Sequence, residues 1–354
     1  MKKFAALAVA GCMAVSLAAC GGSASAPASS EAASTESAAT SAAESAAESV
    51  TEATQGGKVG VCIYKFDDAF MTTYRNALQE ILEGKGYEVT IVDGNNDQAK
   101  QNEQINTFIT QGVDALIINP VMTSAADQII STVKGADVPT VLINREPTAD
   151  QMSAYDKLVY VGCDAAQSGT FQGELILDTE NKGDINGDGK VSYIMIEGDP
   201  ENVDAQYRTE FSVKALKDAG IEVEELDDQV GNWDQAQAQS LVANSLAQHG
   251  KDIEVVFCNN DAMALGALQA IEAAGETVGT DVYLVGVDAL QEACDNVKAG
   301  KQTGTVFNDH ISQSHSAADA AVKYITGGDN EHYIGCDYVK VTTDNVDDVL
   351  ASLG

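Results

Sequence analysis

Residues 184–208 read DINGDGKVSYIMIEGDPENVDAQYR, an oxygen-rich loop followed by an apolar run and then by a polar segment of helix length. The apolar run, residues 191–196, is of strand length and ends just before Gly198, Asp199 and Pro200, which are typical strand-terminating residues. A strand that leads directly into a helix is the repeating unit of an α/β fold with a parallel sheet. We therefore expect the rest of the chain to be built from the same unit.

Ten apolar runs of strand length, separated by helix-length segments, occupy the chain from Lys58 onward. Five lie in each half: 59–64, 87–92, 115–118, 140–143 and 159–161, then 191–196, 221–226, 254–258, 282–287 and 303–307. Continuous apolar runs between helices predict parallel sheets that are covered on both faces. Residues 160–165 (YVGCDA) also resemble residues 284–289 (LVGVDA). The sequence predicts an α/β fold of two doubly wound parallel-sheet lobes joined by a hinge.

The N-terminus has the pattern of an export signal. Residues 1–20 contain two lysines, a short apolar stretch and a small-residue cleavage pattern that ends at Cys20. The sequence Leu-Ala-Ala-Cys resembles a bacterial lipobox, which predicts that Cys20 is lipidated and holds the protein at the extracytoplasmic face of the cell membrane; a soluble secreted protein is the alternative. Residues 21–57 are almost wholly Ala, Ser, Thr, Glu and Gly, so we expect a disordered tether.

The remaining residues, about 300, are enough for two lobes. A helix-like segment at 312–325 and a strand-like segment at 338–342 are long enough to cross back between them. We therefore assign 58–164 and about 309–340 to an N-terminal lobe, and 165–308 and about 341–354 to a C-terminal lobe. The net charge of -34 argues against binding to nucleic acid or to anionic lipid. We expect a monomer.

Five cysteines lie beyond the signal segment, which is an odd number for an exported protein: Cys62, Cys163, Cys258, Cys294 and Cys336. At most two disulfides can form among them. Cys62 and Cys258 lie within apolar runs and have no CxxC partner, so we interpret them as small buried hydrophobic residues rather than redox or zinc residues.

The loop at 184–192 has the spacing of oxygen ligands in an EF-hand. Asp184, Asn186 and Asp188 alternate along a glycine-containing turn, Lys190 offers a backbone carbonyl, and Ser192 occupies the ninth position. The twelfth position, where an EF-hand places a bidentate Glu, is Met195. The loop is thus either a calcium site that takes a carboxylate from elsewhere or a solvated turn.

Polar and aromatic residues follow the apolar runs in both halves. They are Asp67, Asp68, Phe70, Asn144, Arg145 and Glu146 in the first half, and Asp204, Arg208, Trp233, Asn259, Asn260, Asp261, Asp288, Asn308 and Asp309 in the second. In open parallel sheets, ligands bind beyond the carboxyl ends of the strands. Asp, Asn and Arg side chains suit sugar hydroxyls, and Phe and Trp rings suit the C–H faces of a pyranose.

Each of these positions also has a structural explanation. Asp68 or Asp261 can cap a helix, and Trp233 can belong to a core. Asp204 and Arg208 stand four residues apart and can form an ordinary surface ion pair.

Several of these stretches resemble the galactose/glucose-binding proteins of bacterial ABC importers. The similar stretches are VGVCIYKFDDAFM from Val59, NREP from Asn144, the calcium-like loop, DAQYR from Asp204, WD from Trp233, NNDAMA from Asn259 and VGVDA from Val285. The resemblance covers the chain after the tether. It implies two type I periplasmic binding protein lobes and a receptor that closes around glucose or galactose and delivers it to an ABC permease.

The resemblance also implies roles for single residues. Phe70 and Trp233 would sandwich the sugar ring, and calcium would be held by Asp184, Asn186, Asp188, the Lys190 carbonyl, Ser192 and the distant Glu254. Hydrogen bonds to the sugar hydroxyls would come from Asp68, Asn144, Asp204, Arg208, Asn260, Asp288 and Asn308. Asn202 stands where the family has a histidine that contacts sugar, and Ser192 where it usually has Gln, so hexose preference and one metal ligand depart from the family pattern.

Two other functions remain open. A glycoside hydrolase also places carboxylates around a sugar, although Arg208 and the amides should keep Asp68, Asp204 and Asp288 ionised rather than raise one pKa for acid catalysis. No GxSxG, GxxxxGK[ST] or HExxH motif is present, and no GxGxxG follows a strand, so we expect no enzyme activity. A receptor that hands sugar to a chemotaxis or sensor protein is the third possibility.

Overall fold

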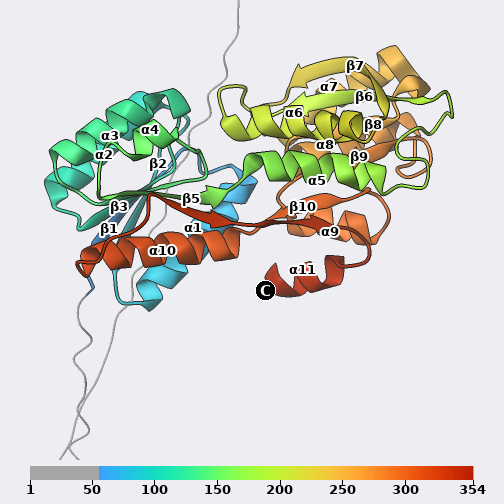
Figure 1. Cartoon of the computed structure of the whole chain (residues 1–354). Helices are drawn as coiled ribbons and strands as arrows, with labels where there is room; N and C mark the ends of the chain where they lie inside the picture. The colour runs from blue at the N-terminus through green and yellow to red at the C-terminus, as the bar shows by residue number, and fades with distance from the viewer. Residues whose placement is uncertain (1–55, 354) are drawn as a thin grey trace, which may run out of the picture. The chain divides into compact units, whose positions relative to one another are not determined.

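The computed structural model describes residues 56–353 (Figure 1). The predicted signal segment, Cys20 and most of the predicted tether lie outside the described residues. The strands are β1 (Lys58–Ile63), β2 (Glu88–Asp93), β3 (Ala115–Ile118), β4 (Thr140–Ile143), β5 (Leu158–Cys163), β6 (Lys190–Glu197), β7 (Glu222–Val230), β8 (Val255–Cys258), β9 (Tyr283–Val285), β10 (Thr305–Asn308), β11 (Tyr333–Cys336) and β12 (Tyr338–Val341).

Helices connect nearly all of these strands. They are α1 (Ala69–Gly84), α2 (Gln98–Gln111), α3 (Ala126–Gly135), α4 (Ala149–Met152), α5 (Ala165–Leu177), α6 (Val203–Asp218), α7 (Gln235–His249), α8 (Asp261–Ala274), α9 (Gln291–Lys298), α10 (His310–Ile325) and α11 (Val346–Leu353). None of the helices within residues 56–353 has the length and apolarity of a bilayer span.

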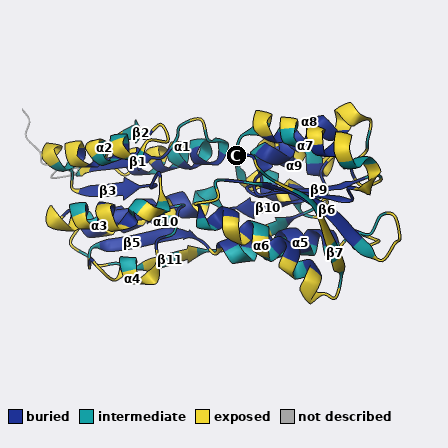
Figure 2. Cartoon of the chain, turned by 90° about the horizontal axis from the view of Figure 1, so that it is seen from above, coloured by how far each residue is buried: buried dark blue, intermediate teal, exposed yellow. Residues whose placement is uncertain are grey.

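The N-terminal lobe is a six-stranded parallel sheet in the order β11-β5-β4-β3-β1-β2. Side chains alternate between its two faces because successive residues of a strand point in opposite directions. Val61 and Ile63 pack against α1 and α10, whereas Cys62 packs against α2 and α3. Both faces are therefore covered, as the apolar runs predict. The inner strands β1, β3 and β4 and the neighbouring β5 are buried, whereas the edge strands β2 and β11 are partly exposed and the helices expose their outer faces (Figure 2).

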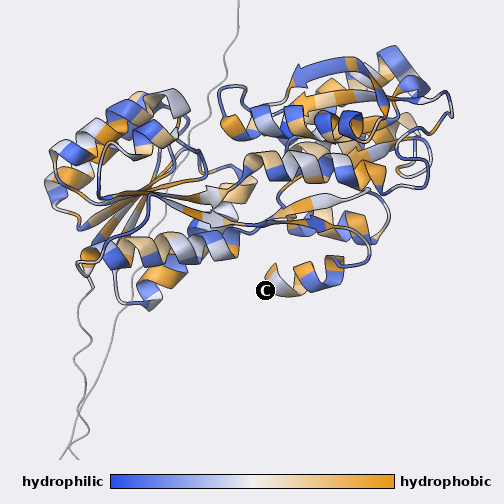
Figure 3. Ribbon diagram, viewed as in Figure 1, coloured by the Kyte–Doolittle hydropathy of each residue, from blue (hydrophilic) through white to orange (hydrophobic). Residues whose placement is uncertain are grey.

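The C-terminal lobe has a four-stranded parallel sheet in the order β7-β6-β8-β9. Ile194 and Ile196 of β6 pack under α7 and α8, and Tyr193 and Met195 face the side covered by α5 and α6. The predicted doubly wound α/β architecture is confirmed in both lobes. Figure 3 shows apolar residues gathered in the inner strands and polar residues on the outer faces of the helices and in the edge strand β7.

The strand pairing near the C-terminus departs from the prediction in two respects. β10 pairs antiparallel with β12, because β12 arrives from the other lobe and runs in the opposite direction. The β10 region meets the β9 region only through isolated parallel bridges. β11 was not expected as a strand; its residues alternate between exposed and half-buried at the edge of the sheet, so it lacks an apolar run. The chain crosses to the second lobe between Cys336 and Tyr338, slightly earlier than the expected boundary near residue 340.

All five cysteines of the described region are free thiols. Cys62 and Cys258 have no exposed surface, as expected for small hydrophobic residues in strands. Burial raises the pKa of the Cys62 thiol to about 12, so it remains protonated.

Candidate functional site

A cavity is lined by residues from both lobes. Its lining consists of Tyr64, Asp68, Phe70, Met71, Asn144 and Arg145 from the N-terminal lobe, and Asn202, Asp204, Arg208, Trp233, Asn260, Asp288 and Asn308 from the C-terminal lobe. All ten side chains that the sequence suggested for ligand binding are in this set.

Asp68 lies between β1 and α1 and lines the cavity. One carboxylate oxygen accepts a hydrogen bond from the Met71 N–H at 2.7 Å and so caps α1, and the other accepts from the Tyr64 hydroxyl at 2.7 Å. Helix capping and cavity lining are therefore combined in one residue. Burial and the Asp68 carboxylate raise the pKa of Tyr64 well above its usual value, so this hydroxyl stays a donor.

Asn144 and Arg145 follow β4. Asn144 has a left-handed backbone (φ 63°), and its side-chain oxygen accepts a hydrogen bond from Asn119 at 3.1 Å. The Arg145 guanidinium is 1% exposed, lies 4.5 Å from the centre of the Tyr64 ring and donates to Asp199 at 3.1 Å. Arg145 thus brings a buried positive charge from the N-terminal lobe to an acidic residue of the C-terminal lobe.

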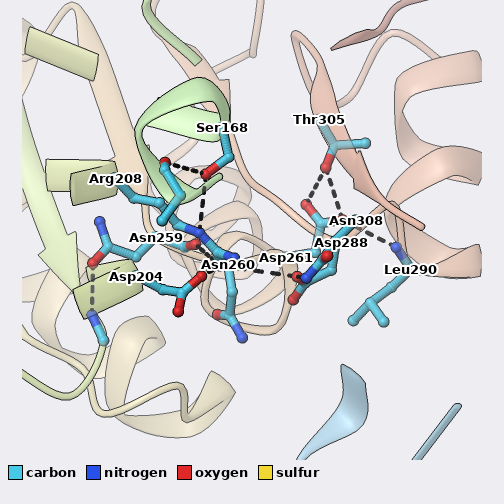
Figure 4. A network of polar contacts seen from close by, with 12 residues as sticks. Ser168, Asp204, Arg208, Asn259, Asn260, Asp261, Asp288, Leu290, Thr305 and Asn308 are labelled. Atoms are coloured by element: carbon cyan, nitrogen blue, oxygen red, sulfur yellow. Dashed lines mark hydrogen bonds and ion pairs between the residues drawn. The ribbon is translucent and has the colours of Figure 1, made fainter. Parts of the chain in front are cut away.

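Arg208 is the centre of the polar network in the C-terminal lobe (Figure 4). Its guanidinium donates to the Asn259 carbonyl at 2.9 Å, the Tyr338 hydroxyl at 3.1 Å, and Asp204 and Ser168 at 3.3 Å each. The Asp288 carboxylate lies 3.9 Å away. The interpretation of Asp204 and Arg208 as a surface ion pair is wrong, because helix α6 turns both side chains into the interior.

Close packing of α5 on α6 places Arg208 in this network. A Cβ atom on Gly169 would lie 2.7 Å from the Tyr207 carbonyl oxygen, and one on Gly173 would lie 2.4 Å from the Ser212 carbonyl oxygen. Glycine weakens a helix by about 1 kcal/mol relative to alanine, but here it lets the two backbones approach. The approach brings Ser168 within hydrogen-bonding distance of Arg208.

The remaining polar residues come from helix N-termini and from β10. Asn202 caps α6 by accepting from the Asp204 N–H at 3.0 Å, and Asn260 caps α8 by accepting from the Met263 N–H at 3.0 Å. Each uses its oxygen for the cap, which leaves the NH₂ group as a donor for a ligand. Asn308 donates to Asp288 at 3.2 Å.

Phe70 and Trp233 lie against the same cavity from different lobes. Phe70 makes edge contacts with Tyr74 and His310, at ring distances of 6.0 and 6.4 Å. The Trp233 ring covers Gly198, where an added Cβ would lie 2.1 Å from a ring carbon. The cavity therefore has an apolar surface on each side in addition to its polar groups.

A model of the periplasmic binding protein domain matches residues 59–329. The chain belongs to the periplasmic binding protein family. A D-galactose/methyl-galactoside binding periplasmic protein of Haemophilus influenzae is 36% identical to this binding protein, over 83% of this chain and 92% of that one. A putative rhizopine-binding protein of Rhizobium meliloti is 34% identical, over 83% of this chain and 93% of that one.

The fold comparison agrees with the sequence comparison. An ABC transporter solute binding protein from Bacillus halodurans with bound myo-inositol superposes on this periplasmic binding protein with a TM-score of 0.75 and 30% identity, over 84% of this chain and 98% of that one. The type I periplasmic binding protein fold is confirmed, and the chain is a binding protein rather than an enzyme.

The two carboxyl groups beside Arg208, those of Asp204 and Asp288, have raised pKa values. Burial raises the pKa of Asp204 and raises that of Asp288 well above its usual value, although Arg208 acts in the opposite direction on both. Desolvation thus outweighs the guanidinium, contrary to the expectation that Arg208 keeps these carboxyls at ordinary pKa values. The assignment as a binding protein rests on family membership instead.

Several strand-end residues of this periplasmic binding protein lie away from the cavity wall. Asp67 pairs with Lys65 at the surface, Asp309 caps α10, and Glu146 lines a separate cavity. Asn259 and Asp261 are buried behind the wall, and Asn260 rather than Asp261 caps α8.

Three lining residues are additional to the ten for which the family resemblance implied contact with the ligand: Tyr64, Met71 and Arg145. Tyr64 ends the first apolar run and Arg145 follows the fourth. These positions at strand ends were the only indication in the sequence that the two residues could line the cavity. Nothing in the sequence distinguished them from neighbouring residues that point elsewhere.

The calcium-like loop forms a compact turn beside β6. Asp184 accepts from the N–H groups of Gly187, Asp188 and Gly189, and Glu254 accepts from those of Asn186 at 2.9 Å and Ser192 at 2.8 Å. Glu254 thus reaches the loop from a distant part of the chain. Within residues 56–353, no three His, Cys, Asp or Glu side chains form a metal-binding group, so any cation would depend on the amide and backbone oxygens as well.

Proposed function

We propose that this periplasmic binding protein is an extracytoplasmic receptor that closes its two lobes around a monosaccharide and presents it to an ABC permease. The observation that carries the proposal is that carboxylates, amides, two guanidinium groups and the rings of Phe70 and Trp233 line the same cavity. Sugar hydroxyls donate and accept at once, which this mixed set satisfies, and the C–H faces of a sugar pack on aromatic rings.

The residues that line the cavity have different roles in binding, according to whether they accept or donate hydrogen bonds. Asp68, Asp204 and Asp288 accept hydrogen bonds from hydroxyls, whereas Asn260 and Arg208 donate. Closure excludes water from the cavity, which strengthens these bonds. A ligand that contacts both lobes shifts the population toward the closed form, and that form is the signal for the importer.

Glucose and galactose are the sugars that we propose as ligands. The galactose-binding relative from Haemophilus influenzae supports a hexose. Asn202 lies in the cavity wall with an uncharged donor, so the contact it makes with a hydroxyl is weaker than one from a cation. A cyclic polyol is the second candidate, because the Bacillus halodurans solute binding protein with bound myo-inositol is 30% identical.

Isothermal titration calorimetry with D-galactose, D-glucose, D-ribose and myo-inositol tests the proposal. We expect a hexose to bind most tightly, and Asp68→Ala to weaken that binding by roughly 10- to 100-fold, the range for a charge-assisted hydrogen bond. Asp67→Ala is the matched control, since Asp67 is adjacent but lies at the surface. Absence of binding for all four compounds, or equal effects of the two variants, contradicts the proposal.

Trp233 provides an independent test of the apolar contact. Trp233→Ala removes the ring beside Gly198, and we expect a loss of hexose affinity of about tenfold or more. The control is Tyr207→Ala, which removes an aromatic ring that is 39% exposed on α6. Unchanged affinity in Trp233→Ala counts against packing of the ligand on this ring.

We also propose that the loop at 184–192 binds calcium. The set of Asp184, Asn186, Asp188, the Lys190 carbonyl, Ser192 and Glu254 consists only of oxygen donors, which suits a hard cation. Glu254→Ala is a poor test, because Glu254 also accepts two backbone N–H groups and its loss lowers stability without any metal.

Asp188→Asn is the better test of the metal. It keeps the oxygen that accepts from the Lys190 N–H and removes only the charge. We expect wild type and Asp188→Asn to melt at the same temperature in chelator, and Asp188→Asn to gain less stability than wild type at a limiting calcium concentration, because an amide oxygen holds the cation less strongly than a carboxylate does. A calcium-dependent shift of the same size in both proteins removes the assignment.

Membrane attachment through Cys20 completes the proposal. Cys20 lies outside the described residues, and the support is the lipobox-like sequence before it. We expect the full-length protein to fractionate with membranes and Cys20→Ser to be released. Equal membrane association of both proteins contradicts lipidation at this position.

A further inference from the structure

The loop that carries Asp288 has an unfavourable backbone conformation. Asp288 has φ 118° and Ala289 has φ 53°, so two consecutive residues with side chains adopt positive φ. Such conformations persist only where the surrounding structure holds them. They turn the Asp288 carboxylate toward Arg208 and the cavity, with Asn308 donating to it at 3.2 Å.

Asp261 holds this loop from both sides. Its N–H donates to the Val287 carbonyl at 2.7 Å, one residue before Asp288, and its carboxylate accepts from the Leu290 N–H at 3.0 Å, two residues after it. Asp261 therefore bonds to the backbone on each side of the strained pair. Figure 4 shows the contact of its carboxylate with Leu290.

The Asp261 carboxylate is itself fixed in place. The Thr305 hydroxyl lies 2.8 Å from both of its oxygens, and the Gln302 amide donates to one of them at 3.1 Å. A Cβ atom on Gly286 would lie 2.2 Å from the same carboxylate, so only glycine fits there. The Asp261 side chain has no exposed surface and is absent from the cavity wall.

We propose that Asp261 is a positioning residue for ligand binding, which holds the strained 287–290 segment so that the Asp288 carboxylate stays in the cavity. This inference rests on the proposed function for the identity of the ligand. Asp261 does not contact the ligand and acts through Asp288. Its negative charge opposes that of Asp288, so its contribution comes from hydrogen bonds to the backbone and not from attraction of a ligand.

Two substitutions at Asp261 have different expected effects. Asp261→Ala removes every bond to the loop from the side chain, and we expect the affinity for D-galactose to fall by about tenfold or more. Asp261→Asn can keep a carbonyl oxygen at the Leu290 N–H. We expect Asp261→Asn to retain affinity within about threefold.

A double-mutant cycle with Asp288→Ala separates positioning from general destabilisation. Calorimetry with D-galactose on wild type, Asp261→Ala, Asp288→Ala and the double variant should show no further loss from Asp261→Ala once Asp288 is absent. The control is Ser245→Ala, which removes a buried hydrogen bond to Asp227 elsewhere in the lobe. Additive losses, wild-type affinity in Asp261→Ala, or equal weakness of Asp261→Asn and Asp261→Ala overturns the proposal.

Hydrogen exchange of the sugar-free protein tests the inference without reference to a ligand. The amide of Leu290 should exchange at least about tenfold faster in Asp261→Ala than in wild type, because its acceptor is gone. If Asp261→Ala does not fold, Thr305→Val loosens the same carboxylate and should accelerate the same amide. Unchanged exchange overturns the proposal, whereas faster exchange in a protein that binds none of the four compounds supports the positioning role and rejects the proposed function.

Discussion

Arg208→Met removes the positive charge from the network in the C-terminal lobe while keeping an unbranched side chain in its place. The guanidinium is 4% exposed and bonds to four groups, and the Asp204 and Asp288 carboxylates lie within 4 Å of it. Removing one partner of a buried ion pair costs about 3–5 kcal/mol, because the other charge stays buried without compensation. Domains unfold with about 5–15 kcal/mol in total, so this variant should be severely destabilised.

The destabilisation should depend on pH in a defined direction. Burial already raises the pKa values of Asp204 and Asp288, and loss of Arg208 raises them further. A carboxyl group with a raised pKa in the folded state favours folding at low pH, and this contribution is lost as the pH rises through the folded-state pKa. The difference between Arg208→Met and wild type should therefore be larger at pH 8 than at pH 5.

Urea unfolding followed by far-UV circular dichroism measures both effects. Lys214→Met is a matched control, because Lys214 and Asp218 form an ion pair with the same spacing on the same helix, but at the surface. We expect that control to lose less than about 0.5 kcal/mol. A loss below about 1 kcal/mol in Arg208→Met, or the same loss at pH 5 and pH 8, would contradict the role of Arg208 as the charge that compensates the two buried carboxylates.

Further predictions concern ligand affinity, helix packing and metal binding. Hexose affinity should fall as the pH is lowered from 7 to 5, since Asp204 and Asp288 accept stronger hydrogen bonds from hydroxyls when ionised and their pKa values are raised; calorimetry across this range that shows constant affinity contradicts this role. Gly169→Ala should displace α6 and lower both the melting temperature and the hexose affinity, whereas Gly84→Ala, at an open helix position, should leave affinity unchanged. Asp188→Asn should reduce the calcium-dependent rise in melting temperature at a limiting calcium concentration but leave hexose affinity in chelator unchanged.

The architecture follows directly from the pattern of apolar runs. Residues that alternate toward two covered faces must be apolar at every position, and this requirement appears in the sequence of β1, β3, β4, β5, β6 and β8. Residues that follow these strands at their carboxyl ends are likewise visible as short polar clusters. For this reason the pattern predicts the two lobes and the edge of the sheets where polar residues gather, whereas the set of ten candidate ligand residues came from the family resemblance.

Long-range contacts determine the position of the edge strand β11 and which side chains face the cavity. β11 is an edge strand with one exposed face, so no apolar run marks it, and its place beside β5 depends on the return of the chain from the second lobe. Arg145 and Glu146 are neighbours in sequence, yet only Arg145 faces the shared cavity, because backbone direction after β4 sets which side chain points inward.

Asp204 and Arg208 show the same limit on a helix. A spacing of four residues places them on one face of α6, but whether that face meets water or the interior depends on the close approach of α5 through Gly169 and Gly173. Local sequence determines which residues share a face or a strand end. Burial, and with it the strength of a charge and the direction of a pKa shift, depends on which distant segment packs against that face.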